Sequence, residues 1–151
     1  MTTFSELPLG SALKRKLAAA QFTHLTQIQE RAIPTALEGC DVIGTAQTGT
    51  GKTLAFLIPL IETLNRKPAR HAVALVLLPT RELAMQVHEQ YEQLRTKAMP
   101  RAALIIGGVS ERVQIQSLRA GSGLVIATPG RLQDLMNRKV AGRAARQNTR
   151  T

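Results

Sequence analysis

Eight residues, Ala46 to Thr53, constrain the fold of this chain more than any other stretch, and they read Ala-Gln-Thr-Gly-Thr-Gly-Lys-Thr. The short apolar run Asp41–Ala46 precedes them and the apolar run Leu54–Ile58 follows, so the pattern predicts a strand, a glycine-rich loop and a helix. Such a loop points successive backbone N–H groups at the N-terminal end of a helix, where they cradle an anion. In the general pattern G-x-x-x-x-G-K-[ST], only the first glycine is replaced, by Ala46.

The residue types in this loop indicate a nucleoside triphosphate site of the Walker A kind. Lys52 can reach the outer phosphates, and the Thr53 hydroxyl can ligate Mg²⁺ that arrives with the nucleotide. We therefore take Lys52 and Thr53 as candidate catalytic residues. The predicted phosphate-binding residues are Ala46, Gln47, Thr48, Gly49, Thr50, Gly51, Lys52 and Thr53. The alternative is a Gly/Thr-rich turn that happens to precede a helix, and the strand and helix predicted on either side argue against it.

Length and composition favour one globular domain with its own core, since the chain has 151 residues of which 44% are apolar. No apolar run approaches the roughly 18 to 20 residues of a membrane span, and the N-terminus lacks the pattern of a signal peptide. The single cysteine, Cys40, excludes an internal disulfide and fits a reducing compartment. We expect a cytoplasmic protein without a membrane segment, and the sequence indicates no obligate protein partner.

The formal net charge of +10 is compatible with a polyanionic partner. Residues 138–151 carry five basic side chains and no acidic one, so half of the excess lies in this short segment.

Apolar periodicity predicts alternating helices and strands. The predicted helices are Leu7–Ala20, Thr26–Leu37, Lys52–Leu64, Arg81–Lys97, Ser110–Ala120 and Gly130–Asn137, and the predicted strands are Asp41–Ala46, Ala72–Leu78, Ala102–Ile106 and Leu124–Ala127. Pro34 is expected to kink or shorten its helix, and Gly39 to close it. Val113 and Leu118 are expected to face inward. Repeated strand–helix units of this size predict an α/β fold with a parallel sheet between two layers of helices.

Ligands in such sheets gather beyond the carboxyl ends of the strands, and all four predicted ends carry Gly, Thr or Arg. These residues hold phosphate through backbone N–H groups, hydroxyls and guanidinium groups. The first strand leads into the phosphate loop. The other three lead into Pro79-Thr80-Arg81, Gly107-Gly108 and Thr128-Pro129-Gly130-Arg131. Four such ends on one edge suggest a phosphate-rich polymer lying across it, although each taken alone could be a turn or a helix cap.

Together these segments resemble the first RecA-like domain of DEAD-box ATP-dependent RNA helicases, over Phe4 to about Leu135. The phosphate loop resembles motif I of the family, including its alanine in the first position. Pro79 to Ala84 resembles motif Ia, Gly107-Gly108 the GG motif, and Thr128 to Arg131 motif Ib. The resemblance implies a three-layer RecA-like P-loop NTPase domain and ATP as the nucleotide. It also implies contact with the RNA sugar-phosphate backbone, independent of base sequence, through Pro79, Thr80, Arg81, Gly107, Gly108, Thr128, Pro129, Gly130 and Arg131.

Residues 22–29, with Phe4 upstream, resemble the Q motif, which reads adenine in this family. The resemblance places Gln29 at the adenine-binding position, where its amide can pair with N6 and N7, and Phe22 is the first choice for the ring that packs on the base. Two residues depart from the motif, Gln21 in place of Gly and Leu25 in place of Pro. Thr26-x-x-Gln29 is also a helix capping box, and both roles can hold.

The family places two acidic functions in an Asp-Glu-Ala-Asp motif about 20 residues after motif Ib, and this chain has no such motif. Its only aspartates are Asp41 and Asp134, and no Glu follows Glu111. We therefore expect an incomplete RecA-like domain, without the acidic-motif strand and the second domain, and with no hydrolytic activity or very little. The predicted organisation is a Q-motif region (1–30), a partial ATP-binding domain (31–137) and a basic, disordered tail (138–151).

The Ala/Gly/Arg-rich composition of the tail favours a truncated or frameshifted helicase. A short protein with a basic RNA-binding tail and a deliberately shortened chain remain alternatives. For function, the alternatives to a helicase portion are a non-catalytic module or interfering fragment that binds ATP or RNA, and a different P-loop NTPase with an unfamiliar acid.

Overall fold

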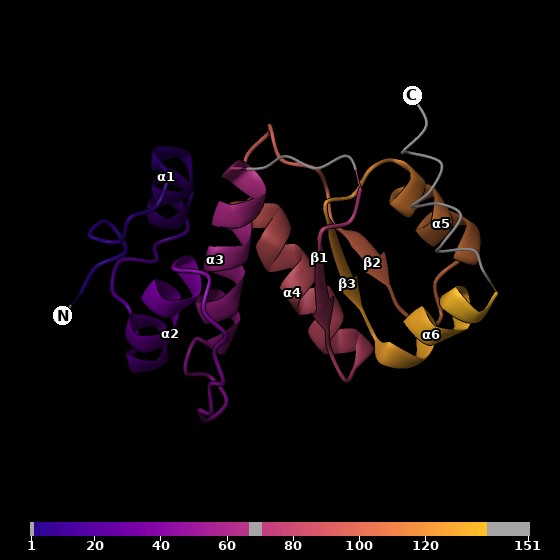
Figure 1. Cartoon of the computed structure of the whole chain (residues 1–151), viewed down its shortest axis with the longest axis horizontal. Coiled ribbons are helices and arrows are strands. Elements are labelled where there is room, and N and C mark those ends of the chain that lie inside the picture. The colour runs from indigo at the N-terminus through magenta and orange to yellow at the C-terminus, as the bar shows by residue number, and fades with distance from the viewer. Residues whose placement is uncertain (1, 67–70, 139–151) are drawn as a thin grey trace. The chain divides into compact units, whose positions relative to one another are not determined.

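The computed structural model describes residues 2–66 and 71–138, which form two compact units (Figure 1). The first, which we call the phosphate-loop unit, comprises residues 2–66 with 93–96. The second, which we call the sheet unit, comprises residues 71–92 with 97–138. Apart from Arg138, the predicted tail lies outside the described residues, and its predicted disorder stays a prediction.

The phosphate-loop unit is built from α1 (Ser11–Ala19), α2 (Gln27–Leu37) and α3 (Lys52–Arg66). Helix α2 packs against α3. The prediction that Pro34 shortens its helix is wrong, because α2 continues through it to Leu37. Gly39 follows with a φ of 84°, a left-handed conformation that glycine adopts without strain, and so closes the helix as predicted. The helices bury aliphatic side chains, the largest being Leu13, Leu17, Ile33, Leu57, Ile58, Ile61 and Leu64.

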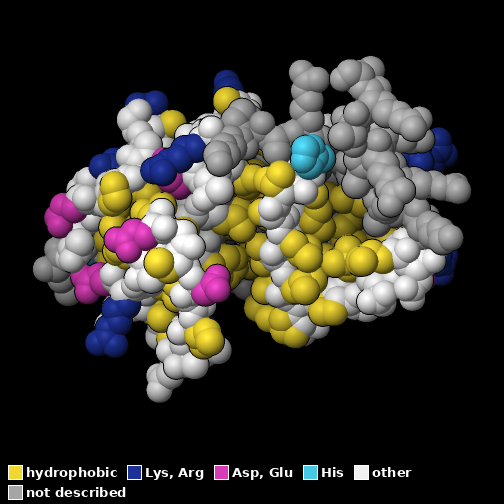
Figure 2. Space-filling model, in the orientation of Figure 1, with side chains coloured by type: hydrophobic (Ala, Val, Ile, Leu, Met, Phe, Trp, Pro, Cys, Tyr) yellow, Lys and Arg dark blue, Asp and Glu magenta, His cyan; other side chains and the backbone are white. Residues whose placement is uncertain are grey.

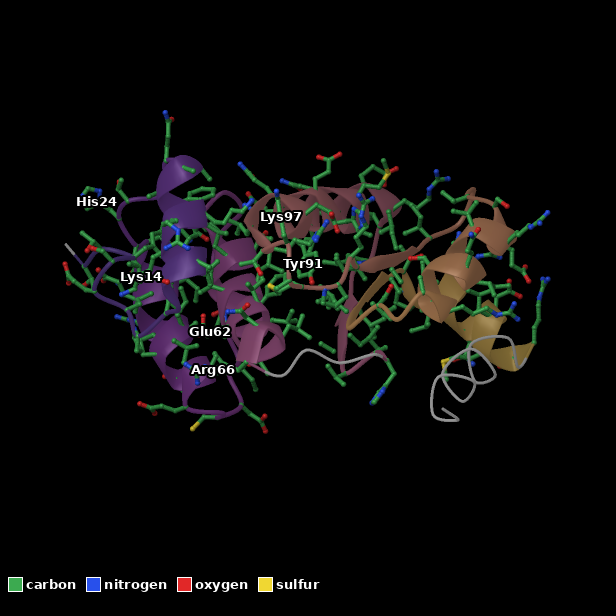
Figure 3. The ribbon with its side chains drawn as sticks, turned by 90° about the horizontal axis from the view of Figure 1, so that it is seen from above. Lys14, His24, Glu62, Arg66, Tyr91 and Lys97 are labelled. Carbon is green, nitrogen blue, oxygen red and sulfur yellow. The ribbon has the colours of Figure 1, made fainter. Side chains whose placement is uncertain are left out.

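One buried carboxylate joins α1 to α3. Glu62 is buried in α3, and its Oε2 accepts a hydrogen bond from the backbone N–H of Gly10 at 3.1 Å, just before α1 begins. Its Oε1 pairs with Arg66 Nε one turn later at 3.3 Å, and Figure 3 shows the two side chains together on α3. A buried charge without partners would destabilise the fold, so these contacts explain how α3 accommodates an acid on its inner face.

The predicted strand Asp41–Ala46 is wrong. Residues 40–47 have no regular secondary structure, and no described segment forms a ladder with them. Val42 and Ile43 are 42% and 99% exposed, so the apolar run is not buried either. Strand formation requires a neighbour that accepts and donates the backbone hydrogen bonds, and an apolar sequence pattern does not reveal whether one is present.

The sheet unit contains the predicted parallel sheet, with β1 (Ala74–Leu77), β2 (Ala103–Ile105) and β3 (Leu124–Ala127) in the order β1-β3-β2. Ile126 is opposite Val76 on one side and Leu104 on the other, which fixes the register of the three strands. The central strand β3 is buried throughout, as expected for a parallel strand with a neighbour on each side. The α/β class predicted from the sequence is therefore confirmed.

Helices lie on both sides of this sheet, with α4 (Arg81–Leu94) on one side and α5 (Glu111–Arg119) and α6 (Pro129–Asn137) on the other (Figure 1). Leu118 packs inward against the core as predicted, but Val113 is 57% exposed, so that prediction is wrong. The neighbouring Gln114 occupies the inward position and is 1% exposed. The core on this side consists of Ala103, Ile105, Val125, Ala127 and Leu135, with Leu118 and Leu132 packed against it.

Strand β1 has a less complete cover than β3. Leu75 and Leu77 are about half exposed, as is Val73 just before the strand, and Figure 2 shows hydrophobic side chains on the surface of the sheet unit. Within the described ranges, no helix has the length and apolar character that crossing a bilayer requires.

Candidate functional site

The phosphate loop has the backbone conformation of an anion cradle. Gly49 and Gly51 have φ angles of 82° and 84°, and α3 begins directly afterwards at Lys52. Among the described residues, the backbone N–H groups of residues 46–51 find no backbone acceptor. A Cβ on Gly49 would meet no atom within 4 Å, so the loop is open on that side. Free N–H groups at a helix N-terminus fit the phosphates of a nucleotide.

Side chains of the loop are held by the loop itself. The Lys52 ammonium donates a hydrogen bond to the Ala46 carbonyl, and the Thr50 hydroxyl donates to the Gln47 carbonyl at 2.7 Å. Lys52 is exposed, so it can exchange this carbonyl for a phosphate oxygen by rotating its flexible stem. The other predicted side chains of the loop, Thr48 and Thr53, are exposed and half-buried, respectively.

The capping box at the start of α2 is present and does more than cap the helix. The Thr26 N–H donates to Gln29 Oε1 at 2.9 Å, and the reciprocal contact from the Gln29 backbone to the Thr26 side chain is also present. In addition, Gln29 Nε2 donates to the Gly51 carbonyl at 3.0 Å, and the Thr26 hydroxyl donates to the Thr50 carbonyl at 2.7 Å. The two residues therefore brace the phosphate loop from α2, a role that the sequence analysis missed.

Two aromatic side chains near this brace have different environments. Phe4 is buried in the core, and its N–H donates to the Thr23 carbonyl at 3.1 Å beside a bridge between Thr3 and His24. Phe22 is half-buried, so part of its side chain is accessible. Phe22 therefore remains the candidate for packing on a base, while Phe4 anchors the N-terminal segment.

The three RNA-motif candidates meet at one edge of the sheet unit. Because the strands are parallel, their carboxyl ends point the same way. The guanidinium of Arg81, which follows β1, lies so close to Gly108, which follows β2, that a Cβ there would be 2.9 Å from Arg81 Cζ. The Thr128 N–H, which follows β3, donates to the Ile105 carbonyl at 3.0 Å. Thr80 caps α4, accepting the Leu83 N–H at 3.3 Å.

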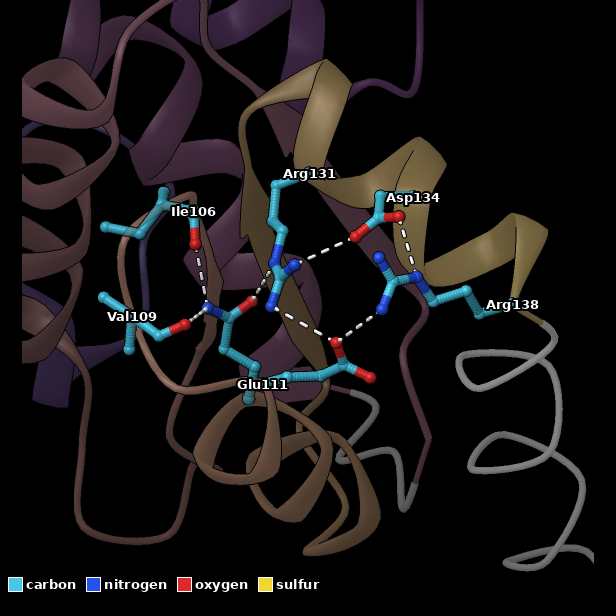
Figure 4. A network of polar contacts seen from close by, with 7 residues as sticks. Ile106, Val109, Glu111, Arg131, Asp134 and Arg138 are labelled. Carbon is cyan, nitrogen blue, oxygen red and sulfur yellow. Dashed lines mark hydrogen bonds and ion pairs between the residues drawn. The ribbon is translucent and has the colours of Figure 1, made fainter.

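Arg131 lies in a network of polar contacts between α5 and α6 (Figure 4). Its guanidinium donates from Nε to Gln114 Oε1 at 3.4 Å and from Nη1 to Asp134 Oδ2 at 2.9 Å, and Nη2 pairs with Glu111 Oε2 at 3.7 Å. Arg138 binds the same two acids. Gln114 and Glu111 were not among the residues predicted from the sequence. A polar residue at an inward position of an amphipathic helix was the available signal for Gln114.

The described residues offer little for a metal ion besides Thr53. They contain no cluster of three or more His, Cys, Asp or Glu side chains suited to a metal. Asp134 is committed to Arg131 and Arg138, and Asp41 lies exposed in the segment before the phosphate loop. The predicted nucleotide residues all belong to the phosphate-loop unit, whereas the predicted RNA residues all belong to the sheet unit.

The sequence model of the DEAD/DEAH box helicase family matches residues 26–150. The chain belongs to the DEAD/DEAH box helicase family. The match begins at the capping threonine of α2 and continues into the segment that composition had set apart as a tail.

Similar proteins agree with this assignment. The chain is 46% identical to the ATP-dependent RNA helicase has-1 of Neurospora crassa over 136 residues, which are 88% of this chain and 24% of that protein. It is 45% identical to the DEAD-box ATP-dependent RNA helicase CshA of Streptococcus pneumoniae over 136 residues, which are 90% of this chain and 26% of that protein. The chain thus spans about a quarter of the length of these curated relatives.

Solved structures show the same fold. A DEAD box protein from the hyperthermophile Methanococcus jannaschii superimposes with a TM-score of 0.85 at 36% identity, over 93% of this chain and 38% of that one. A hypothetical ATP-dependent RNA helicase from Sulfolobus tokodaii superimposes with a TM-score of 0.78 at 32% identity, over 87% of this chain and 38% of that one. The described residues therefore have the fold of part of a DEAD-box RecA-like domain.

Proposed function

We propose that this chain is the ATP-binding and RNA-binding portion of a DEAD-box RNA helicase, acting in a reducing, cytoplasmic compartment. The observation that carries the proposal is the brace from Thr26 and Gln29 to the carbonyls of Thr50 and Gly51, because it joins the adenine motif to the phosphate loop. A nucleotide bound here would contact the adenine motif with its base and the phosphate loop with its phosphates, and hydrogen bonds connect these two segments.

In this proposal, different residues of the phosphate-loop unit bind different parts of the nucleotide. Phe22 packs on the base, and Gln29 offers its remaining N–H and lone pair to the adenine edge while keeping its contact with Gly51. The free N–H groups of residues 46–51 and the Lys52 ammonium bind phosphate oxygens, and the Thr53 hydroxyl holds Mg²⁺. Bound ATP with Mg²⁺ supplies the phosphoryl chemistry of the family.

The residues of the sheet unit would bind the RNA backbone. Arg81 offers a guanidinium, Thr80 and Thr128 offer hydroxyls, and Gly107, Gly108 and Gly130 permit close approach of backbone N–H groups to phosphate. Pro79 and Pro129 set the turns, and Arg131 keeps N–H groups beyond those that bind its acidic partners. None of these groups reads a base, so binding would be independent of sequence and sensitive to salt.

Turnover requires an acid that positions water, and both aspartates are poorly suited to that task. We therefore propose that these 151 residues bind ATP and RNA without hydrolysing ATP appreciably, and that unwinding belongs to a longer helicase. The second candidate is a non-catalytic or interfering ATP- and RNA-binding module, which the ion pairing of Asp134 favours. The two share the same binding sites and differ only in the biological setting.

Binding of a fluorescent ATP analogue with Mg²⁺ tests the nucleotide site. Lys52→Ala should weaken binding by about tenfold or more, because it removes a charge-assisted contact to phosphate. Lys16→Ala, an equal loss of charge on the exposed end of α1, should leave binding within about twofold of wild type. Equal affinities of wild type and Lys52→Ala would refute the site.

An ATPase assay with single-stranded RNA tests whether the chain turns over. We expect no RNA-stimulated hydrolysis above that of Lys52→Ala. Hydrolysis that RNA stimulates and that depends on Lys52 would contradict the proposed incompleteness and would require an acid not identified here.

A further inference from the structure

Gln114 is the one polar residue of α5 that is buried, at 1% exposure, next to Val113 at 57%. A helix that exposes an aliphatic side chain and buries an amide gains nothing from the hydrophobic effect at this position. A buried amide destabilises the fold unless its hydrogen-bonding groups are satisfied. The contacts of Gln114 therefore decide what this side chain does.

The amide of Gln114 closes the Gly107-Gly108 turn by binding the residues on either side of it, Ile106 and Val109, which Figure 4 labels. Its Nε2 donates to the Ile106 carbonyl at 2.8 Å and to the Val109 carbonyl at 3.1 Å, which are the carbonyls immediately before and after the two glycines. Both amide hydrogens are thereby used within the protein. The turn is held with Gly108 at a φ of 75° and with the Arg81 guanidinium against it.

The other end of the same amide holds Arg131. Gln114 Oε1 accepts from Arg131 Nε at 3.4 Å, and Glu111, one turn earlier on α5, pairs with Nη2 of the same guanidinium at 3.7 Å. One buried side chain thus connects the turn after β2 to the start of α6 after β3. These are two of the three segments that would bind the RNA backbone in the proposed function.

We propose that Gln114 is a positioning residue for RNA binding, which sets the Gly107-Gly108 turn and orients Arg131 without touching RNA itself. The inference rests on the proposed function, since it concerns the same RNA surface. Because a turn with fixed carbonyls also has fixed N–H directions, the amide presents the glycine N–H groups to phosphate in one arrangement. Loss of the amide should cost RNA affinity through geometry rather than through charge.

The substitution Gln114→Glu tests the donor role of the amide separately from its acceptor role. The carboxylate still accepts from Arg131, but it cannot donate to Ile106 and Val109. Fluorescence anisotropy with a labelled single-stranded oligouridylate, measured over a salt series, should show affinity about tenfold weaker, with an unchanged salt slope because no charged contact to phosphate is lost. Gln116→Glu, with the same charge change at an exposed position of α5, should weaken binding by no more than about twofold and keep the slope.

A measurement on the wild-type chain keeps the test valid if the variant fails to fold. In ¹⁵N spectra, the side-chain amide protons of Gln114 should exchange slowly with water, and those of Gln116 quickly. On addition of the RNA, the chemical shifts of the Gly107 and Gly108 backbone amides should change, whereas those of the Gln114 side-chain amide should stay nearly constant. Fast exchange of the Gln114 amide, or shifts as large as those of the glycines, would overturn the positioning role.

The outcomes separate the inference from the proposed function. RNA affinity unchanged in Gln114→Glu, or weakened together with a lower salt slope, would overturn the inference alone if the wild type binds normally. Failure of the wild-type chain to bind the RNA at all would overturn the proposed function and this inference together.

Discussion

The phosphate loop and the Gly107-Gly108 turn are both glycine-containing loops held by a glutamine side chain, but different neighbouring elements support them. The phosphate loop has two glycines in left-handed conformations, Gly49 and Gly51, and the turn has one, Gly108. Each is braced by a buried glutamine whose amide donates to backbone carbonyls of the loop or turn. The Gly107-Gly108 turn also follows β2, a strand within the sheet. The phosphate loop instead follows residues 41–46, of which 41–45 are exposed and none pairs with a strand among the described residues.

The difference indicates how each loop is held. The Gly107-Gly108 turn has two restraints, the preceding strand β2 and the amide of Gln114, so each can partly replace the other. The phosphate loop has helix α3 on one side, and on the other it depends on the brace from Thr26 and Gln29. A change that disturbs this brace should therefore have a larger effect than the equivalent change at the Gly107-Gly108 turn.

The largest effect is expected for Gly51→Ala. The new Cβ would clash with Gln29 Nε2 and lie 3.2 Å from the Thr26 hydroxyl, at a φ of 84° that disfavours side chains. We expect a loss of about 2 to 4 kcal/mol in the free energy of unfolding, from backbone strain plus the broken buried hydrogen bonds, and a loss of ATP binding. Urea unfolding and nucleotide titration measure these two effects.

Gly49→Ala is the matched control, because its φ is 82° but its Cβ would meet no atom within 4 Å. It should carry the backbone strain alone, about 1 to 2 kcal/mol. Equal destabilisation by the two substitutions would show that the brace contributes nothing to the loop.

A smaller effect is expected for Gly108→Ala. The φ of 75° makes the substitution strained, and the Cβ would displace the Arg81 guanidinium, which is a flexible group that can move. Stability should fall by about 1 to 2 kcal/mol, and RNA affinity should fall severalfold. Gly107→Ala, where a Cβ meets nothing within 4 Å and φ is not in the left-handed region, should change both by little. RNA affinity that depends on neither glycine would remove this turn from the binding surface.

The smallest effect concerns a turn that has neither a glycine nor a glutamine brace. Gln21, after α1, adopts a φ of 62°, where the Q motif of the family has Gly. Gln21→Gly should stabilise the chain by about 0.5 to 1 kcal/mol by relieving this strain, while ATP and RNA binding stay unchanged. Gln86→Gly, in the exposed middle of α4, should instead destabilise by about 1 kcal/mol. Thermal melting with the two variants side by side would detect opposite signs, and a shared sign would refute the strain at Gln21.

Local patterns predicted most of the secondary structure. β3 has the bounds expected from its apolar run, and α2 begins at the capping threonine that its sequence indicates. These elements are specified by short-range features, namely capping boxes, glycine stops and apolar periodicity. Segment 41–46 has the same kind of apolar pattern as β1 and failed as a strand, because pairing depends on a distant neighbour that no local pattern encodes.

The candidate site shows the same distinction between features set by local sequence and contacts between distant segments. Residue type and spacing were enough to propose the motif residues of the phosphate loop and those after β1, β2 and β3, because backbone N–H groups, hydroxyls and guanidiniums have fixed chemistry. The partners of those residues were not identifiable. Gln29 and Gly51 are 22 positions apart, and Gln114 and Arg131 are 17 apart.

By itself, the sequence determined the family and the α/β class, and it singled out the loops that we propose bind phosphate. It did so because each depends on local order along the chain. Only the tertiary structure decided that two buried glutamines hold those loops and that Arg131 is bound by acids. It also showed that the segment before the phosphate loop has no partner strand among residues 2–66 and 71–138. Hydrogen bonds between distant segments depend on where the backbone places them, so the same glutamine can be a helix cap in the sequence and a loop brace in the fold.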